Sequence, residues 1–168
     1  KSKRLPNLQA VIKIGGSIER GFIEFQEVAG KASEKDKDRI KDLTNILQFD
    51  DPINIQFTSG TTGFPKGATL THFNVLNNGY FTGESLKFTS DDRLCVPVPL
   101  YHCFGMVLSN IAALTHGAAL IYPDEAFDPL SVLEAVQEEK CTGLHGVPTM
   151  FIAELEHPRF KKFDLSSL

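Results

Sequence analysis

The most informative ten residues of this chain are Thr58-Ser59-Gly60-Thr61-Thr62-Gly63-Phe64-Pro65-Lys66-Gly67. They contain four hydroxyl side chains, three glycines and one lysine, and they follow Ile53–Phe57, where apolar and polar residues alternate as in a strand. Glycines let the backbone approach a ligand closely, and hydroxyl and N–H groups donate hydrogen bonds. Lys66 adds a positive charge behind a proline that stiffens the turn. Because polyphosphate oxygens accept such bonds, the run predicts a loop that binds a triphosphate.

The run differs from a Walker A loop, which has four residues between its first glycine and Gly-Lys-Ser/Thr. Here two residues separate Gly60 from Gly63, and glycine follows Lys66. A flexible glycine- and threonine-rich linker is the plainer alternative. A linker has no use for a lysine fixed behind a proline, or for a strand before it and a capped helix after it. We therefore favour the phosphate loop.

After the loop, the sequence alternates between strand and helix patterns. Ala68–Thr71 predicts a short strand, and Thr71 can cap a helix over residues 72–86. This segment has several poor helix formers, so packing on a sheet must stabilise it. We expect that packing to come from Phe73, Leu76 and Tyr80.

Three more alternations of strand and helix follow. Strands are expected at Arg93–Val98, Ala118–Tyr122 and Leu144–Val147. Helices are expected between and after them, the second starting at Asp128-Pro129 and the third at Pro148. The inward face of the first helix, which ends at Gly117, is expected to comprise Phe104, Val107, Leu108, Ile111 and Leu114. This order predicts an α/β fold, a parallel sheet with helices on both faces.

Residues 1–52 carry weaker signals, so we divide the chain into residues 1–52 and a core at 53–168. Leu8–Ile14 predicts a strand and Asp36–Phe49 a helix. Phe22–Ala32 predicts a short helix whose inward residues are Ile23, Val28 and Ala29.

Two strand-to-helix turns are candidates for a second part of the site. In open α/β sheets, ligands bind beyond the carboxyl ends of the strands. We therefore expect His102 and Phe104 to face the same crevice as the phosphate loop and to line or gate an acyl or aromatic pocket. A lone histidine is more often a helix cap or a structural residue, and that alternative stays open. In the turn Gly146–Phe151, Met150 and Phe151 are more typical of a core.

Composition excludes several classes of function. The net charge of −4 argues against a general nucleic-acid binder, and no apolar run is long enough for a membrane helix, so we expect a soluble chain. The histidines have no metal-ligand spacing, so no metal site is assigned. Cys95, Cys103 and Cys141 are expected to be buried free thiols in a reducing compartment.

The quoted run, with Ala68–His72 after it, resembles the AMP-binding signature of the adenylate-forming superfamily. Pro99–Gly105 resembles the second core motif of that superfamily, and Gly146–Phe151 resembles a further stretch near its acyl pocket. The order and spacing agree across Ile53–Pro158. Within the superfamily, the residues of the second and third motifs look closest to those of the medium-chain acyl-CoA synthetase family member 2 type, which is mitochondrial.

The resemblance implies the chemistry of an ATP-dependent acyl-CoA synthetase. A fatty-acid carboxylate would attack the α-phosphorus of ATP, bound with Mg²⁺, to give acyl-adenylate and pyrophosphate, and the CoA thiol would then displace AMP. Lys66 and His102 would be catalytic, and His102, Phe104 and Val147 would contact the acid. The residues implied to hold the β- and γ-phosphates are Thr58, Ser59, Gly60, Thr61, Thr62, Gly63, Phe64, Pro65 and Lys66.

The superfamily's later motifs, including its Tyr-Gly-x-Thr-Glu stretch and its C-terminal lysine, do not occur. We therefore expect an incomplete piece of the large N-terminal domain that is inactive by itself. Another adenylate-forming enzyme, such as a coumarate-CoA ligase or a luciferase-like oxidase, is one alternative. An excised subdomain without turnover is the other. We expect an intracellular protein, mitochondrial by resemblance only, and the sequence sets no oligomeric state.

Overall fold

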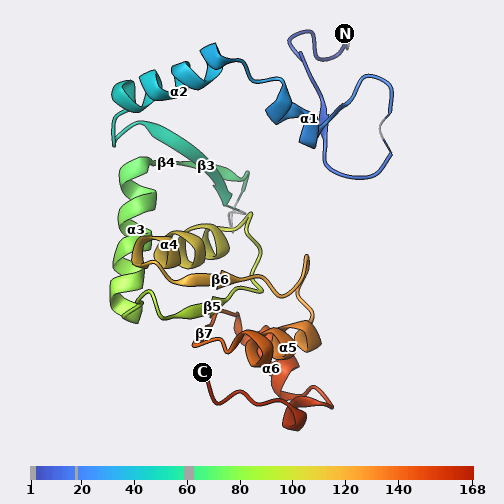
Figure 1. Ribbon diagram of the computed structural model, residues 1–168, viewed down its shortest axis with the longest axis vertical. Helices are drawn as coiled ribbons and strands as arrows, with labels where there is room; N and C mark the ends of the chain where they lie inside the picture. Colours follow the sequence, from blue (N-terminus) through green and yellow to red (C-terminus); the bar gives the residue numbers. More distant parts are fainter. Residues whose placement is uncertain (1–2, 18, 59–62) are drawn as a thin grey trace. The chain divides into compact units, whose positions relative to one another are not determined.

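The computed structural model describes residues 3–17, 19–58 and 63–168 (Figure 1). The chain divides into two compact units, Lys1–Leu47 and Gln48–Leu168. Among the described residues, no helix has both the length and the apolar character needed to cross a membrane.

The first unit contains four short elements. Strands β1 (Ile12–Lys13) and β2 (Ile23–Glu24) pair in parallel, and helices α1 (Phe25–Gly30) and α2 (Glu34–Ile46) follow. Helix α2 begins with a capping box, in which the Ser33 Oγ accepts from the Asp36 N–H and the Asp36 carboxylate accepts from the Ser33 N–H. The Ser33 N–H and the Ser33 hydroxyl both donate to the Asp36 carboxylate and lower the pKa of Asp36. Local signals therefore fix the start of α2.

The predicted inward face of the first unit is wrong in part. Ile23 is half-buried, but Val28 and Ala29 are exposed, and neither α1 nor α2 has a buried residue. The expected strand at residues 8–14 is only two residues long. Helical spacing produces a core only where a second layer covers the apolar face, and two-residue strands provide no such layer.

In the second unit, β3 (Pro52–Thr58) and β4 (Lys66–Thr71) form an antiparallel hairpin. Both strands were predicted from the sequence. Their pairing was not, and it places them in a two-stranded sheet separate from the parallel one (Figure 1).

The parallel sheet has three strands in the order β6-β5-β7. Their bounds are Arg93–Cys95 for β5, Ala119–Ile121 for β6 and Gly143–Leu144 for β7, within or at the edge of the expected segments. Along β5 and its extension, alternate residues face opposite sides. Leu94 packs in a cluster with Ala113, whereas Cys95 packs in another with Val132 and Val136. The prediction of a parallel sheet with helices on both faces is confirmed.

Helix α3 (His72–Leu86) has the predicted bounds and the predicted Thr71 cap. Its predicted packing on a sheet is wrong. Phe73, Leu76 and Tyr80 are exposed, and the Tyr80 ring stacks on His116 of the following helix. The buried residues of α3 are Gly79 and Gly83. A methyl group at Gly79 would lie 2.5 Å from the Ile111 Cγ2. Helix α3 therefore packs on a helix rather than on a sheet, and glycine permits the close approach.

The next helix begins as a π-helix, η1 (Phe104–Ile111), and continues as α4 (Ala112–His116). It ends at Gly117 in the left-handed conformation, as predicted. Its predicted face is wrong at Leu114, which is 65% exposed. A π-helix bonds residue i to i+5, so its wider turn shifts the buried face away from the 3.6-residue spacing. The buried residues are Gly105, Val107, Ser109, Ala112 and Ala113.

Helices α5 (Pro129–Glu139) and α6 (Pro148–Leu155) and a short 3₁₀ turn, η2 (Phe160–Lys162), complete the second unit. The Asp128 side chain caps α5 by accepting from the Ser131 N–H, as predicted. Helices α5 and α6 pack against each other.

All three cysteines are free thiols, but only Cys95 and Cys141 are buried. The expectation of burial is wrong for Cys103, which lies in the exposed turn before η1. Burial raises the pKa of the Cys95 thiol to about 12, so this thiol is protonated and unreactive at neutral pH.

Candidate functional site

The predicted phosphate loop lies at the tip of the β3–β4 hairpin. Thr58 is the last residue of β3, Lys66 is the first of β4, and the two pair in register. Both residues are exposed, as are Gly63, Phe64 and Pro65. Ser59, Gly60, Thr61 and Thr62 lie outside the described residues. Lys66 forms no ion pair with the part of the chain that the structure describes. Its ammonium group is open to a ligand.

His102 lies in the exposed turn that leads from β5 into η1. Its Nδ1 accepts a hydrogen bond of 3.1 Å from the Phe104 N–H. The first N–H groups of a helix have no partner within the helix, so the imidazole acts here as an N-terminal cap. This is the structural alternative that the sequence left open. It leaves Nε2 available for another contact.

Phe104 is the first residue of η1 and is half-buried. It packs against the cluster that contains Leu94 and Val96. Its ring centroid lies 5.2 Å from that of His145, in the turn after β7. Val147, two residues further on, is exposed at the start of α6. The structure thus brings Phe104 and the Val147 turn to the carboxyl ends of the neighbouring strands β5 and β7.

One premise of the sequence analysis is wrong. His102 and the phosphate loop were placed at the same edge because both were assigned to one parallel sheet, but β3 belongs to a different sheet from β5. The hairpin and η1 are nevertheless neighbours, since the Asn54 Nδ2 lies 3.9 Å from the Met106 Sδ. Contact with η1, rather than sheet order, brings the hairpin near this region.

A pocket of about 550 Å³ opens beyond the carboxyl ends of β5 and β6. It is lined by the segments that follow these strands, residues 96–101, 122 and 124–127. This is the edge at which open α/β sheets bind ligands. One of its lining residues, Tyr101, directly precedes His102 in the chain. Among the described residues, no group of three or more His, Cys, Asp or Glu side chains could hold a metal ion.

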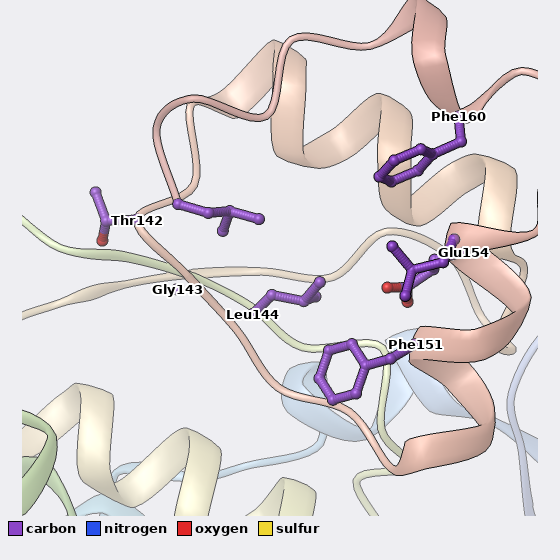
Figure 2. A pocket seen from close by; sticks show the side chains of 8 residues that line it. Thr142, Gly143, Leu144, Phe151, Glu154 and Phe160 are labelled. Atoms are coloured by element: carbon purple, nitrogen blue, oxygen red, sulfur yellow. The ribbon is translucent and has the colours of Figure 1, made fainter.

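A second pocket, of about 460 Å³, lies between β7 and α6 (Figure 2). Figure 2 shows the Glu154 carboxylate between Phe151 and Phe160, near Leu144. Glu154 is only 4% exposed, and its Oε1 has no hydrogen-bond partner among the residues that the structure describes. Burial raises the pKa of this carboxyl to about 7. No motif drew attention to Glu154, because its sequence neighbours read as an ordinary amphipathic helix.

The sequence analysis also missed Ser109 and His145. Ser109 is fully buried, and its Oγ lies 3.1 Å from the Phe104 carbonyl oxygen and 2.8 Å from the His145 Nδ1. Burial lowers the pKa of His145, so this imidazole is neutral at neutral pH. The polar pair Ser109-Asn110 inside a mainly apolar helical segment was the available signal for Ser109.

A comparison with known families gives a match over nearly the whole chain. The family described as AMP-binding enzyme matches residues 2–168. The chain belongs to this family. The predicted resemblance of the chain to the adenylate-forming superfamily is thereby confirmed.

Relatives of this AMP-binding family member carry the names of acyl-CoA ligases. The acyl-CoA ligase SID4 of Ajellomyces capsulatus is 47% identical over 167 residues, which are 99% of this chain and 28% of SID4. The mitochondrial medium-chain acyl-CoA ligase ACSF2 of Danio rerio is 45% identical over 170 residues, which are 100% of this chain and 28% of ACSF2. The chain therefore spans less than a third of the length of these relatives.

A solved structure agrees with the fold. The anthranilate CoA ligase AuaEII, in complex with anthranoyl-AMP, superposes with a TM-score of 0.80 at 25% identity. The superposition covers 98% of this chain and 31% of AuaEII. The chain thus has the fold of a part of an adenylate-forming ligase.

Proposed function

We propose that this chain is the phosphate-binding part of an AMP-forming acyl-CoA ligase. The full protein would activate a carboxylic acid with ATP and transfer the acyl group to CoA. Residues 53–168 would form the AMP-binding core, and residues 1–52 the N-terminal part of the same large domain. Membership of the AMP-binding family and the ligase names of its relatives support this reading.

The observation that carries the proposal is the placement of Lys66. It stands exposed at the base of the hairpin loop, opposite Thr58, without an ion-pair partner among the described residues. We infer that the residues from Thr58 to Lys66 surround the β- and γ-phosphates, with hydroxyl and N–H groups as donors. Lys66 would stabilise the charge that grows on pyrophosphate as it leaves.

The first step is an in-line displacement at phosphorus. The acid's carboxylate oxygen attacks the α-phosphorus of ATP, the bond from that phosphorus to the bridging oxygen breaks, and pyrophosphate leaves. The second step is attack of the CoA thiol on the acyl carbonyl, with AMP as the leaving group. The protein contributes mostly position and charge stabilisation, as is general for phosphoryl-type transfers.

Mg²⁺ fits this loop as a phosphate-bound ion. Mg²⁺ is commonly held by one or two protein oxygens together with substrate phosphates, and the loop offers hydroxyl oxygens. When bound, Mg²⁺ would neutralise phosphate charge. The protein's own part is to present Lys66 and the loop donors to the same oxygens.

The acid would lie against His102, Phe104 and Val147. Phe104 and Val147, which follow the neighbouring strands β5 and β7, would provide apolar contacts to the acid, and the exposed His102 would lie beside Phe104. We infer a medium-chain fatty acid, because ACSF2 carries that name and shares 45% identity. A mitochondrial location rests on the same relative. The aromatic acid in the AuaEII name makes aromatic acids the alternative to test.

The test is pyrophosphate exchange by the protein expressed from its full reading frame, with straight-chain and aromatic acids in parallel. The Lys66→Ala variant should lower the exchange rate by about 100-fold for every acid, since it removes a donor to the leaving group. The Lys161→Ala variant removes an exposed lysine far along the chain and is the matched control. Equal rates for Lys66→Ala and Lys161→Ala would contradict the assignment of the loop. Exchange with aromatic acids alone would refute the medium-chain assignment.

A further inference from the structure

The π-helix η1 contains a fully buried polar group, the Ser109 hydroxyl. Burying a hydroxyl without a hydrogen-bond partner destabilises a protein, so the partners of Ser109 matter. They are the Phe104 carbonyl oxygen, at 3.1 Å, and the His145 Nδ1, at 2.8 Å. The first lies one π-helical turn back in the chain, and the second comes from the turn after β7.

The two contacts fix the direction of both hydrogen bonds. A serine hydroxyl has one hydrogen, and a carbonyl oxygen can only accept, so Ser109 donates to Phe104. The contact with His145 then requires the Nδ1–H to donate to the Ser109 oxygen. Neutral His145 is therefore protonated on Nδ1, and its Nε2 is the unprotonated nitrogen.

Phe104 is consequently held at three points. Its carbonyl accepts from Ser109, its N–H donates to the His102 Nδ1, and its ring lies against the His145 ring. Ser109 stands five residues after Phe104, the spacing that defines a π-helix, so the hydroxyl reinforces the wide turn itself. The ring of Phe88, 6.5 Å from that of His145, packs on the same imidazole.

We propose that Ser109 and His145 are positioning residues that fix Phe104 and thereby set the shape of the acid-binding surface. Neither side chain needs to touch the acid. The two hydrogen bonds that join His145, Ser109 and Phe104 form what we call the relay. Loss of the relay would let η1 relax toward ordinary α-helical spacing and turn Phe104 away from its present direction. The role in acid selection rests on the proposed function, whereas the hydrogen-bond relay does not.

The first test is independent of activity. Nitrogen-15 NMR of the histidine side chains in the protein expressed from its full reading frame reports the tautomer of each neutral imidazole. His145, assigned with a His145→Phe variant, should show a protonated Nδ1. A protonated Nε2 would overturn the relay, whatever the protein catalyses.

The second test is kinetic, with a series of straight-chain acids. Ser109→Ala and His145→Phe should each raise the KM for the preferred acid by about tenfold and broaden the chain-length preference, because a displaced wall loses complementarity. The KM for ATP and the kcat should change less than about twofold, since the phosphate loop is untouched. The KM for the acid in the double variant should equal that in each single variant, because each substitution alone already breaks the same relay.

Ser85→Ala is the matched control, since the Ser85 Oγ also donates to a backbone carbonyl of its own helix but is exposed. It should leave every parameter unchanged. An unchanged chain-length profile in folded Ser109→Ala would overturn the positioning role. A protein that activates none of the acids would refute the proposed function and the selection role with it, and the tautomer would still decide the relay.

Discussion

Two regions of the molecule each bury a polar side chain. The region around η1 buries Ser109, and the pocket between β7 and α6 buries Glu154. Ser109 has two partners, one from its own helix and one from the turn after β7. The Oε1 of Glu154 has none within the described part of the chain, and the adjoining pocket of about 460 Å³ is lined mainly by apolar side chains. The two regions show that burial by itself does not decide whether a polar group stabilises the fold, because the partner does.

The two regions also differ in packing density, and the region with the paired polar group, around η1, is the more closely packed. Around η1, a single methyl group at Gly79 would overlap Ile111, whereas the space beside Glu154 is open (Figure 2). A closely packed site can hold its donors and acceptors at fixed distances, and a loose one cannot.

The largest effect should be the dependence of stability on pH that Glu154 causes. Burial raises its pKa from 4.5 to about 7, so the folded state favours the neutral acid. The contribution of this group is fully present below pH 4.5 and is lost as the pH rises through 7. The total loss is on the order of 3 kcal/mol. Urea unfolding across this range should show the loss in the parent chain.

Replacing Glu154 by Met should remove this loss and make the chain more stable than the parent above pH 7, with little difference at pH 4. Glu156, exposed at the end of the same helix, provides the control, and Glu156→Met should keep the parent's pH profile. Identical profiles for the parent and Glu154→Met would contradict the account of the pocket.

The second prediction concerns a buried polar group that loses its hydrogen-bond partner. Ser109→Ala leaves the His145 Nδ1–H without its acceptor and should cost about 2 kcal/mol of unfolding free energy. Ser109→Ala combined with His145→Phe removes both partners and should recover about half of that loss. Urea midpoints measure both, and equal losses in the single and double variants would argue against the pairing.

Packing gives the third prediction. Gly79→Ala should destabilise the chain by about 1–2 kcal/mol, because overlap with Ile111 outweighs the gain in helix propensity. Gly30, the last residue of α1, is the control, since it is also helical yet has open space where a methyl would go. Gly30→Ala should be neutral or slightly stabilising, as judged by thermal unfolding. A stabilising Gly79→Ala would show that the η1 region is looser than proposed.

The smallest effect should come from Thr71, which caps the helix that packs on η1. Thr71→Ala removes the acceptor of the Asn74 N–H and should cost about 1 kcal/mol. Thr82, in the middle of the same helix, is the comparison, and Thr82→Ala should change the free energy of unfolding by less than about 0.5 kcal/mol. Circular dichroism during urea unfolding measures both, and a larger loss for Thr82→Ala would reverse the assignment of the cap.

Local signals predicted much of the fold. The bounds of α3, the cap at Asp128 and the helix end at Gly117 came from hydrogen-bonding and conformational preferences of a few adjacent residues. The direction in which each helix faces was less predictable. Leu114 and Tyr80 are exposed because a π-helical turn and a glycine contact replaced the spacing and the layer that the pattern assumed.

The residues of the candidate site likewise fall into those that local motifs predicted and those that only tertiary contacts reveal. Lys66, His102, Phe104 and Val147 were found because they stand in motifs, where neighbours in sequence carry the signal. Ser109 and His145 were missed because they are separated by 36 residues and meet only across η1 and the turn after β7. Glu154 was missed because burial, which raises its pKa, is a property of the packed layers.

The sequence by itself predicted the order of strands and helices, the caps at Thr71 and Asp128, and a phosphate-binding loop at residues 58–67, since each prediction depends on the chemistry of adjacent residues. The tertiary structure was needed to show that β3 and β4 form a separate hairpin and that Gly79 rather than Phe73 is buried in α3. It was also needed to show that Ser109 has a partner, whereas the Glu154 Oε1 has none among the described residues. The reason is that strand pairing, close packing and desolvation depend on residues far apart in the chain.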